Sequence, residues 1–257
     1  MEKSQSQKKC VIVFDSGIGG LNILNACAAK YPQLDYVYAA DNFNMPYGNK
    51  SAEEVFGLST GVLDGAMRFM PSAIVVACNT VTAECIDRLR ERYAVPVIGM
   101  QPAVKEAAAY GGDCAVLVTR ATAESANFNR LIEHNFSEAR VYPCSHLADY
   151  IEKNISSLPE NLPEGLVKIE GKPESIVLGC THYMYLSAQF RRAYGCRIFD
   201  GSEGTARRLG KILGISDHLN EKSGICDHFS EKNSQIVYYG GDINKNRRIY
   251  EQIFKNL

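Results

Sequence analysis

The chain has 257 residues, of which 46% are hydrophobic and 22% charged, which is ordinary for a globular protein with one large or two modest domains. A net charge of −1 argues against an extended nucleic-acid-binding face, and no apolar run approaches the roughly 18 residues of a membrane-spanning helix. The polar N-terminus lacks a signal-peptide core and nine irregularly spaced cysteines argue against a disulfide framework, so we expect a cytoplasmic protein that binds neither nucleic acid nor membrane.

The N-terminal part of the chain alternates apolar strands with helices. Strands are expected at residues 10–15, 35–40, 74–76 and 95–99, and helices at residues 21–30, 51–70 and 81–93. Ser51 is the expected N-cap of the second helix, and Glu53 and Glu54 lie in its first turn.

Two turns in this part offer backbone N–H groups to an anion. The glycine-rich turn of residues 16–20 follows the first strand, but its Gly-x-Gly-Gly spacing falls short of the dinucleotide fingerprint. A tight strand-to-helix connection is therefore favoured over a nucleotide site. The loop of residues 41–48 ends in Pro46-Tyr47-Gly48, which is a common turn sequence and also presents N–H groups from Tyr47 and Gly48.

The same alternation continues to the C-terminus. Strands are expected at residues 114–119, 139–143, 176–178, 196–200 and 235–239, and helices at residues 101–110, 124–135, 184–193, 204–213 and 243–255. Polar loops are expected at residues 154–173 and 214–234. Thr119 and Thr122 either cap the next helix or bind a carboxylate, and capping is the more common role. Regular alternation of strands and helices predicts the α/β class with parallel sheets.

Residues 72–80 and 175–183 share one plan. In each, an apolar run is followed by a small residue, a cysteine and a polar cluster, so that Cys78 and Cys180 occupy matching positions. The carboxyl ends of parallel strands are where open α/β sheets bind ligands, and a following helix N-terminus would stabilise a thiolate. Two thiols that face one cleft can remove a proton from one face of a carbon and return a proton to the other, which is racemase chemistry.

The other cysteines are expected to have structural roles. Five lie within expected strands or helices and are interpreted as small buried hydrophobes: Cys10, Cys27, Cys85, Cys114 and Cys196. Cys-x-His triplets at residues 144–146, 180–182 and 226–228 suggest a metal site as the rival interpretation. Structural zinc sites prefer cysteine pairs two to four residues apart, and the sequence has no Cys-x-x-Cys, so no metal is expected.

Four motifs carry a resemblance to a known family: FDSGIGGL at residues 14–21, PYG at 46–48, ACNT at 77–80 and GCTHY at 179–183. In this order and spacing they resemble the glutamate racemases of the cofactor-independent aspartate/glutamate racemase superfamily. The resemblance implies two similar three-layer α/β domains with mainly parallel sheets and the active site in the cleft between them. The first domain would combine residues 1–98 with 208–257, and the second would span 99–207. The resemblance also implies a homodimer that needs no cofactor.

The same resemblance assigns roles to the site residues. Cys78 would be the base that acts on D-glutamate, and Cys180 the base that acts on L-glutamate. Asp15 would assist Cys78, and His182, with Glu152 nearby, would assist Cys180. The residues expected to contact the substrate are Asp15, Ser16, Pro46, Tyr47, Gly48, Asn79, Thr80, Thr122, Thr181 and His182. A thiolate beside a proton carrier can alternate between base and acid, so these assignments are chemically consistent.

The sequence departs from the family's pattern at several positions. Ser145 and Met184 stand where the family usually has proline. The family's Gly-Thr-x-Gly-Thr appears as Val-Thr-Arg-Ala-Thr at residues 118–122, which places Arg120-Ala121 beside the expected carboxylate pocket. These departures concern rate, regulation and dimer geometry more than the reaction.

Three functions remain open from the sequence. The first is a glutamate racemase that supplies D-glutamate for peptidoglycan synthesis, and the second is a racemase of aspartate or another acidic amino acid. The third is a non-catalytic ligand-binding relative, which the presence of both Cys78 and Cys180 disfavours. The pairs Asn79-Thr80 and Thr181-His182 favour glutamate by resemblance, so the expected partner is a small-molecule substrate.

Overall fold

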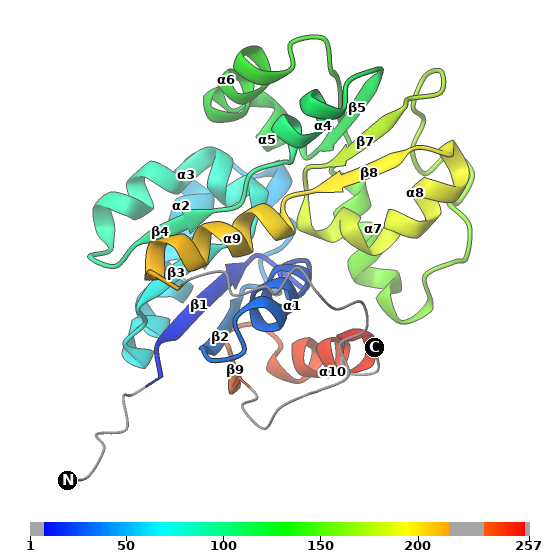
Figure 1. Ribbon diagram of the computed structural model, residues 1–257. Helices are drawn as coiled ribbons and strands as arrows, with labels where there is room; N and C mark the ends of the chain where they lie inside the picture. The colour runs from blue at the N-terminus through cyan, green and yellow to red at the C-terminus, as the bar shows by residue number, and fades with distance from the viewer. Residues whose placement is uncertain (1–7, 216–233, 255–257) are drawn as a thin grey trace, which may run out of the picture.

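The computed structural model describes residues 8–215 and 234–254 and contains two parallel β-sheets with helices on both sides (Figure 1). The first sheet has the strand order β4-β3-β1-β2-β9, formed by β1 (Cys10–Asp15), β2 (Asp35–Ala40), β3 (Ala73–Val76), β4 (Val97–Gly99) and β9 (Ile236–Tyr239). The second has the order β6-β5-β7-β8, formed by β5 (Cys114–Val118), β6 (Arg140–Pro143), β7 (Ser175–Leu178) and β8 (Arg197–Asp200). The pairings are parallel, which confirms the predicted α/β class.

The two sheets share one topology. The order β4-β3-β1-β2 of the first sheet corresponds to β8-β7-β5-β6 of the second, so β3 and β7, which precede Cys78 and Cys180, occupy equivalent places. The additional strand β9 pairs with β2, from Tyr36 opposite Ile236 to Ala39 opposite Tyr239, and returns the C-terminal part of the chain to the N-terminal sheet. This pairing is compatible with a first domain built from both ends of the chain, and the domain boundaries themselves stay a prediction.

Helices cover both faces of each sheet and connect the strands. In the described part of the chain the α-helices are α1 (Leu21–Lys30), α2 (Ala52–Ala66), α3 (Asn79–Arg92), α4 (Val104–Tyr110), α5 (Arg120–Glu124), α6 (Ala126–Asn135), α7 (His146–Asn154), α8 (Ser187–Tyr194), α9 (Ser202–Leu213) and α10 (Ile243–Phe254). The 3₁₀ helices are η1 (Tyr47–Asn49), η2 (Met67–Phe69), η3 (Ile155–Ser157) and η4 (Thr181–Leu186). None of these helices is long and apolar enough to cross a membrane.

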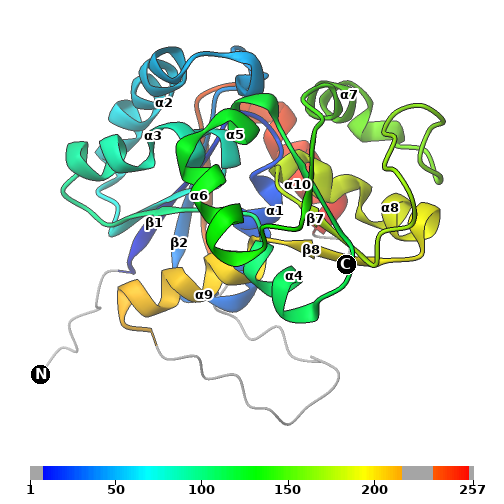
Figure 2. The same cartoon turned by 90° about the horizontal axis from the view of Figure 1, so that it is seen from above.

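Alternate residues of β1 pack into different cores. Val11 and Val13 lie in the core that α1, α9 and α10 form on one face of the first sheet. Ile12 and Phe14 lie in the core that α2 and α3 form on the other face (Figure 2). All four side chains are fully buried, which explains why the strand reads as a continuous apolar run rather than an alternating one.

The second sheet is buried in the same way. Leu117 and Leu178 pack with α7, η4 and α8 on one face, and Val116 and Val177 pack with α4 and α6 on the other. Both sheets are therefore held rigidly by their layers of helices, and their carboxyl edges are left to carry polar side chains.

The structure confirms the expected strands closely and changes several helix boundaries. Ser51 caps α2 as predicted, in a capping box with Glu54. The helix expected at residues 101–110 begins only at Val104, and the one expected at 184–193 is divided into η4 and α8. A short helix that was not expected, α5, precedes α6, because Thr119 caps α5 and Ser125 caps α6. Most of the loop expected at residues 214–234 lies outside the described residues.

Candidate active site

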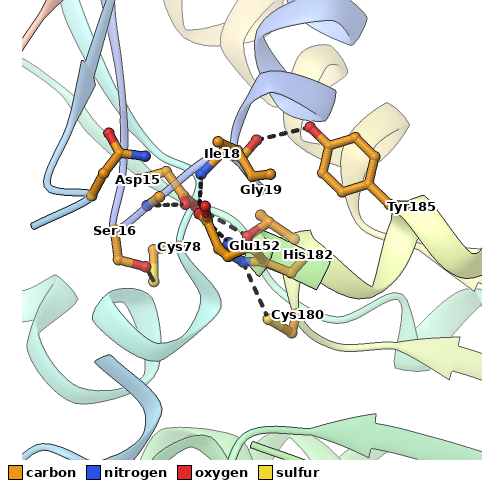
Figure 3. A network of polar contacts seen from close by, with 12 residues as sticks. Asp15, Ser16, Ile18, Gly19, Cys78, Glu152, Cys180, His182 and Tyr185 are labelled. Atoms are coloured by element: carbon orange, nitrogen blue, oxygen red, sulfur yellow. Dashed lines mark hydrogen bonds and ion pairs between the residues drawn. The ribbon is translucent and has the colours of Figure 1, made fainter. Parts of the chain in front are cut away.

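Cys78 and Cys180 lie at the carboxyl edges of the two sheets and line one pocket. Cys78 follows β3 and is the N-cap residue of α3, and Cys180 follows β7 and precedes η4. Both cysteines are buried, with 5% and 7% of their surface exposed. Figure 3 shows the two thiols on either side of a polar network that joins the two halves of the molecule. The structure therefore brings together the two residues that the sequence repeat singled out.

The pocket is small. Its wall consists of residues from both halves of the molecule: Ser16, Met45, Pro46, Tyr47, Gly48, Cys78, Thr80, Thr119, Ser145, Ala148, Cys180, Thr181 and His182. Its volume is about 10 Å³, which is about the space that one water molecule occupies. A ligand of amino-acid size enters only if the walls of the pocket separate.

On the Cys180 side, a chain of polar groups leads away from the thiol. Nδ1 of His182 lies 4.0 Å from Sγ of Cys180, and Nε2 lies 3.0 Å from Oε1 of Glu152 on α7. The same oxygen of Glu152 accepts a hydrogen bond from the backbone N–H of Ile18 at 2.8 Å. The other oxygen, Oε2, accepts one from Nζ of Lys245 on α10 at 2.6 Å. Three predicted residues are thus joined to Lys245, which sequence reasoning missed.

These contacts fix the charges of the pair. Burial alone would raise the pKa of Glu152, but the hydrogen bond and charge of His182 and the ammonium group of Lys245 outweigh it and lower that pKa to about 2. Burial alone would lower the pKa of His182, but its contacts with Cys180 and Glu152 raise it well above the usual value. His182 is therefore an imidazolium held by a carboxylate, and it can supply or take back a proton beside Cys180.

On the Cys78 side, burial has the largest effect on the pKa of the thiol. Oγ of Ser16 lies 3.5 Å from Sγ of Cys78. Burial, and after it the charge of Asp15, raise the pKa of Cys78 to about 12. The N–H of Val81 at the start of α3 acts in the opposite direction and is outweighed. The helix N-terminus thus favours the thiolate at Cys78 as expected, but burial outweighs it, so Cys78 is a thiol at neutral pH.

Asp15 is fully buried and links the two halves of the site. Its carboxylate accepts hydrogen bonds from the N–H of Gly17 at 2.9 Å and from the hydroxyl of Thr181 at 3.1 Å. Burial raises the pKa of Asp15, and the charge of His182 opposes this. A carboxylate in such a place is a stronger base than one in water, as a proton acceptor for Cys78 requires.

The glycine-rich turn after β1 binds a carboxylate of the protein itself, that of Glu152. The N–H of Ile18 in this turn donates to Glu152, so the anion that the turn binds is a side chain of the opposite half. A Cβ atom at Gly17 would collide with the Glu152 carboxylate, and one at Gly19 with the Thr181 hydroxyl. The glycines are needed for this close approach of the turn to the second sheet.

The Pro46-Tyr47-Gly48 loop forms one wall of the pocket. The hydroxyl of Tyr47 donates a hydrogen bond to Oδ2 of the buried Asp41 at 2.7 Å, which holds η1 in place. A Cβ atom at Gly48 would lie 2.8 Å and 2.9 Å from Cβ and Cγ2 of Thr119. Glycine at this position thus lets the loop pack directly on the start of α5.

Three predicted substrate contacts do not line the small pocket: Asp15, which is buried beside it, and Asn79 and Thr122. The last two have another location. They line a separate cavity of about 530 Å³ between α3, α4, α6 and α9. The buried amide of Asn79 has no hydrogen-bond partner among the residues that the structure describes. Thr119 lines the pocket instead, with its Oγ1 3.0 Å from Oγ1 of Thr80 and 2.9 Å from that of Thr122. Thr119 also caps α5, which is the role that the sequence analysis favoured for it.

The departures from the family pattern have different locations. Ser145 lines the pocket, where its Oγ accepts a hydrogen bond from the N–H of Arg120 at 2.8 Å. Arg120 and Ala121 begin α5 beside the pocket. Met184 packs against the core of the first sheet. Only Ser145 among these positions presents a side chain to the pocket.

The described residues contain no group of three or more His, Cys, Asp or Glu side chains suited to a metal ion. Of the Cys-x-His triplets, Cys144 is buried whereas His146 is exposed, with Nε2 2.6 Å from the carbonyl oxygen of Leu166. The triplet at residues 226–228 lies outside the described residues. The eight cysteines that the structure describes are all free thiols.

Comparison with known proteins gives consistent matches over most of the chain. A family model described as Asp/Glu/hydantoin racemase matches residues 21–209. The chain is 36% identical over 220 residues to the glutamate racemase of Clostridium botulinum (strain Kyoto / Type A2), which covers 82% of this chain and 86% of that protein.

Solved structures match as well. The Escherichia coli glutamate racemase in complex with L-glutamate and the activator UDP-MurNAc-Ala superposes with a TM-score of 0.76 and 25% identity, covering 91% of this chain and 99% of that one. The Francisella tularensis glutamate racemase in complex with D-glutamate superposes with a TM-score of 0.75 and 25% identity, covering 96% and 94%. Cys78 and Cys180 both lie within residues 21–209, which the family model matches.

Proposed function

The chain belongs to the Asp/Glu/hydantoin racemase family, and on that premise we propose that it is a glutamate racemase, an isomerase that interconverts L- and D-glutamate. Family membership also confirms the resemblance drawn from the four sequence motifs. The observation that carries the proposal is the single pocket that Cys78 and Cys180 share, each with its own acid–base partner. Glutamate is favoured over other acidic amino acids because the relatives named above are glutamate racemases.

The proposed reaction moves protons between carbon and sulfur. From L-glutamate, the Cys180 thiolate takes the α-proton, so that the carbon–hydrogen bond breaks and a sulfur–hydrogen bond forms. The Cys78 thiol then gives its proton to the opposite face of the carbanion, which leaves a Cys78 thiolate and D-glutamate. The reverse sequence converts D-glutamate. The raised pKa of Cys78 fits the acid role that it has toward L-glutamate.

The buried charges assist each thiol. We assign His182, oriented by Glu152, to Cys180, because its Nδ1 faces that sulfur and its raised pKa supplies a proton carrier. We assign Asp15 to Cys78, because burial makes its carboxylate a better base and its charge acts on that thiol. The α-proton is a very weak acid, so its removal requires a site without bulk water and with donors already in place.

The substrate contacts follow from the pocket wall. Backbone N–H groups of Tyr47 and Gly48 and the hydroxyl of Ser16 are proposed to bind the side-chain carboxylate. The α-carboxylate and amino group would bind hydroxyls from both halves of the molecule, namely those of Thr80, Thr119 and Thr181 in the pocket wall. Asn79 and Thr122 reach the same ligand only after the walls have moved, because they line the neighbouring cavity. Pro46, Asp15 and His182 complete the proposed set.

The wider role is also a proposal that family membership supports. The enzyme would act in the cytoplasm as a homodimer, without a cofactor or metal, and would supply D-glutamate for peptidoglycan synthesis. Sedimentation of the active protein decides the oligomeric state, and a dimer at micromolar concentration is the expected result. Activity that is lost after exhaustive chelation and restored by one metal would contradict the metal-free reaction.

The function can be tested by circular dichroism. The ellipticity of L-glutamate and of D-glutamate should each decay to zero without added cofactor, and that of either enantiomer of aspartate should decay much more slowly. Cys78→Ala and Cys180→Ala should each abolish racemisation in both directions, since every turnover needs one base and one acid. Faster racemisation of aspartate than of glutamate would establish the alternative substrate, and wild-type turnover by either variant would refute the two-thiol mechanism.

A further inference from the structure

We propose that Lys245, on the C-terminal helix α10, is a positioning residue for the Cys180 half of the reaction, because its ammonium group fixes the Glu152 carboxylate that orients His182. The inference rests on the proposed racemase function. It adds to the site a residue that lies 93 positions from its partner in the chain and belongs to none of the four motifs.

The two oxygens of Glu152 have separate partners. Oε1 receives the N–H of Ile18 at 2.8 Å and lies 3.0 Å from Nε2 of His182. Oε2 receives Nζ of Lys245 at 2.6 Å. Because each oxygen is bound from a different direction, the carboxylate cannot turn about its last torsion without losing a charge-assisted hydrogen bond. Lys245 therefore fixes the angle at which Glu152 meets the imidazole ring.

Burial distinguishes this ion pair from an ordinary surface pair. The Glu152 side chain is 5% exposed and that of Lys245 is 27% exposed. A surface pair contributes little, whereas removing one partner of a buried charge leaves the other without compensation. The loss of Lys245 would therefore destabilise mainly the buried negative charge of Glu152.

The charges around Glu152 also balance only with Lys245. The ionisable groups that act on Glu152 or are acted on by it are Asp15, Tyr38, His182, Tyr185 and Lys245. Among them the two carboxylates are offset by one imidazolium and one ammonium. Without the ammonium the Glu152 carboxylate loses a cation that lowers its pKa, so the charged form that binds His182 is less stable.

The backbone that carries Lys245 is itself held in place. Its N–H donates a hydrogen bond to Oδ1 of Asp242 at 2.9 Å. The next residue, Asn246, is 1% exposed and exchanges two hydrogen bonds with Asn42, at 2.9 Å and 3.1 Å. Asn42 follows Asp41, which holds the Pro46-Tyr47-Gly48 loop. The first turn of α10 is thus anchored to the first sheet, so Lys245 approaches Glu152 from a rigid support.

The expected effect appears in isotope effects rather than in a difference between directions. Free L- and D-glutamate are equal in energy, so kcat/KM must fall equally for both in any variant. Loss of Lys245 raises the barrier for proton transfer at Cys180 and leaves the step at Cys78 unchanged. The primary isotope effect on kcat/KM should therefore rise with α-deuterated L-glutamate, which Cys180 deprotonates, and fall with α-deuterated D-glutamate.

The test compares Lys245→Gln with Lys153→Gln in the full-length protein. Lys153 is a matched control, because it follows Glu152 on α7 and pairs with Asp149 at 2.6 Å, but both members of this pair are exposed. We expect Lys245→Gln to lower kcat/KM about tenfold, a small part of the roughly 100- to 10,000-fold that a positioned acid–base group supplies. The acidic limb of its kcat/KM profile against pH should move to higher pH, because the pKa of Glu152 rises when the Lys245 cation is removed. Lys153→Gln should match the wild type in rate, isotope effects and pH profile.

The outcomes separate this inference from the proposed function. Wild-type protein without glutamate racemisation would refute the function itself. With an active wild type, the inference is overturned if Lys245→Gln keeps the wild-type kcat/KM, or loses activity with isotope effects that stay unchanged or move together. Should Lys245→Gln fail to fold, Lys245→Arg decides, because it keeps the cation in another geometry. Isotope effects that shift in opposite senses support the inference, and wild-type isotope effects contradict it.

Discussion

Asp15 and Glu152 are two buried carboxylates whose pKa values the site shifts in opposite directions. Lys245 and His182 hold the pKa of Glu152 at about 2, whereas burial raises the pKa of Asp15 above its ordinary value. A pair of acids whose environments separate their pKa values indicates separate roles. These directions agree with the proposed roles, in which a charged Glu152 orients His182 and Asp15 exchanges a proton with Cys78.

The charged pair of Glu152 and His182 predicts how stability depends on pH. The lowered pKa of Glu152 means that its contribution is complete above about pH 4.5 and is lost as pH falls toward about 2. The raised pKa of His182 means that its contribution is complete below about pH 6.5 and is lost as pH rises through the folded value. Urea unfolding of wild type and Glu152→Gln should therefore differ most between about pH 4.5 and 6.5.

The control for this prediction is Glu53→Gln. Glu53 also pairs with a cation, Arg88 at 2.7 Å, but its side chain is 80% exposed. Its effect on the free energy of unfolding should stay within about 0.5 kcal/mol at every pH. A difference between wild type and Glu152→Gln that does not vary with pH would contradict the charges assigned to the pair.

Tyr47 gives a prediction about the pocket wall. Tyr47→Phe removes the hydroxyl that donates to the buried Asp41 and leaves that carboxylate one donor short. We expect the free energy of unfolding to fall by about 1–3 kcal/mol in urea titrations. Tyr110→Phe, at a residue that is 57% exposed, should change it by less than about 0.5 kcal/mol. Equal effects of the two changes would show that the Tyr47 hydroxyl does not hold the loop.

At the scale of elements, the strands were predictable and some helix starts were not. The strands of both sheets are buried on two faces, so their sequences are unbroken apolar runs whose limits are visible without a structure. The 3₁₀ form of residues 181–186 has no local sequence signal, so an ordinary helix was expected from residue 184. The division between α5 and α6 does have one, because Thr119 and Ser125 are both N-caps, but the sequence was interpreted as a single helix.

The same distinction applies to the site. Cys78 and Cys180 were identifiable because the chain repeats the same pattern around them. Which way a side chain points after a strand depends on the neighbouring elements, and for this reason Asn79 faces the larger cavity while Thr119 faces the thiols. The contact of Lys245 with Glu152 joins residues far apart in the chain, and only the fold reveals it.

The contact between η1 and α5 can be tested with a pair of glycines. In Gly48→Ala the new Cβ would lie less than 3.0 Å from two atoms of the Thr119 side chain, so the loop must move away from Thr119 and the pocket wall changes shape. We expect kcat/KM for glutamate to fall about tenfold to a hundredfold. Gly57→Ala on α2 meets nothing within 4 Å, and it should leave kcat/KM unchanged while stabilising the protein by about 1 kcal/mol. Wild-type kcat/KM for Gly48→Ala would contradict the proposed role of this wall.

At the scale of the whole molecule, two sheets of one topology present equivalent edges to each other. Each edge supplies one cysteine, and hydrogen bonds from Thr181 to Asp15 and from Ile18 to Glu152 join the two halves beside the pocket. The pocket, at about 10 Å³, is too small for an amino acid, so we expect its walls to move apart when substrate enters. A repeated strand–cysteine unit thus places two thiols in one pocket, and the proposed function assigns one of them to each face of the substrate.

The position of solvent deuterium during turnover tests this central claim most directly. Wild-type enzyme equilibrated in deuterated water is given L-glutamate, and both enantiomers are separated at low conversion and analysed by mass spectrometry. With Cys180 as base and Cys78 as acid, the D-glutamate formed should carry deuterium at the α-carbon, while the remaining L-glutamate keeps its hydrogen. Product that retains the original hydrogen, or L-glutamate that gains deuterium as fast as product forms, would mean that one group serves both faces, and would contradict the two-thiol account.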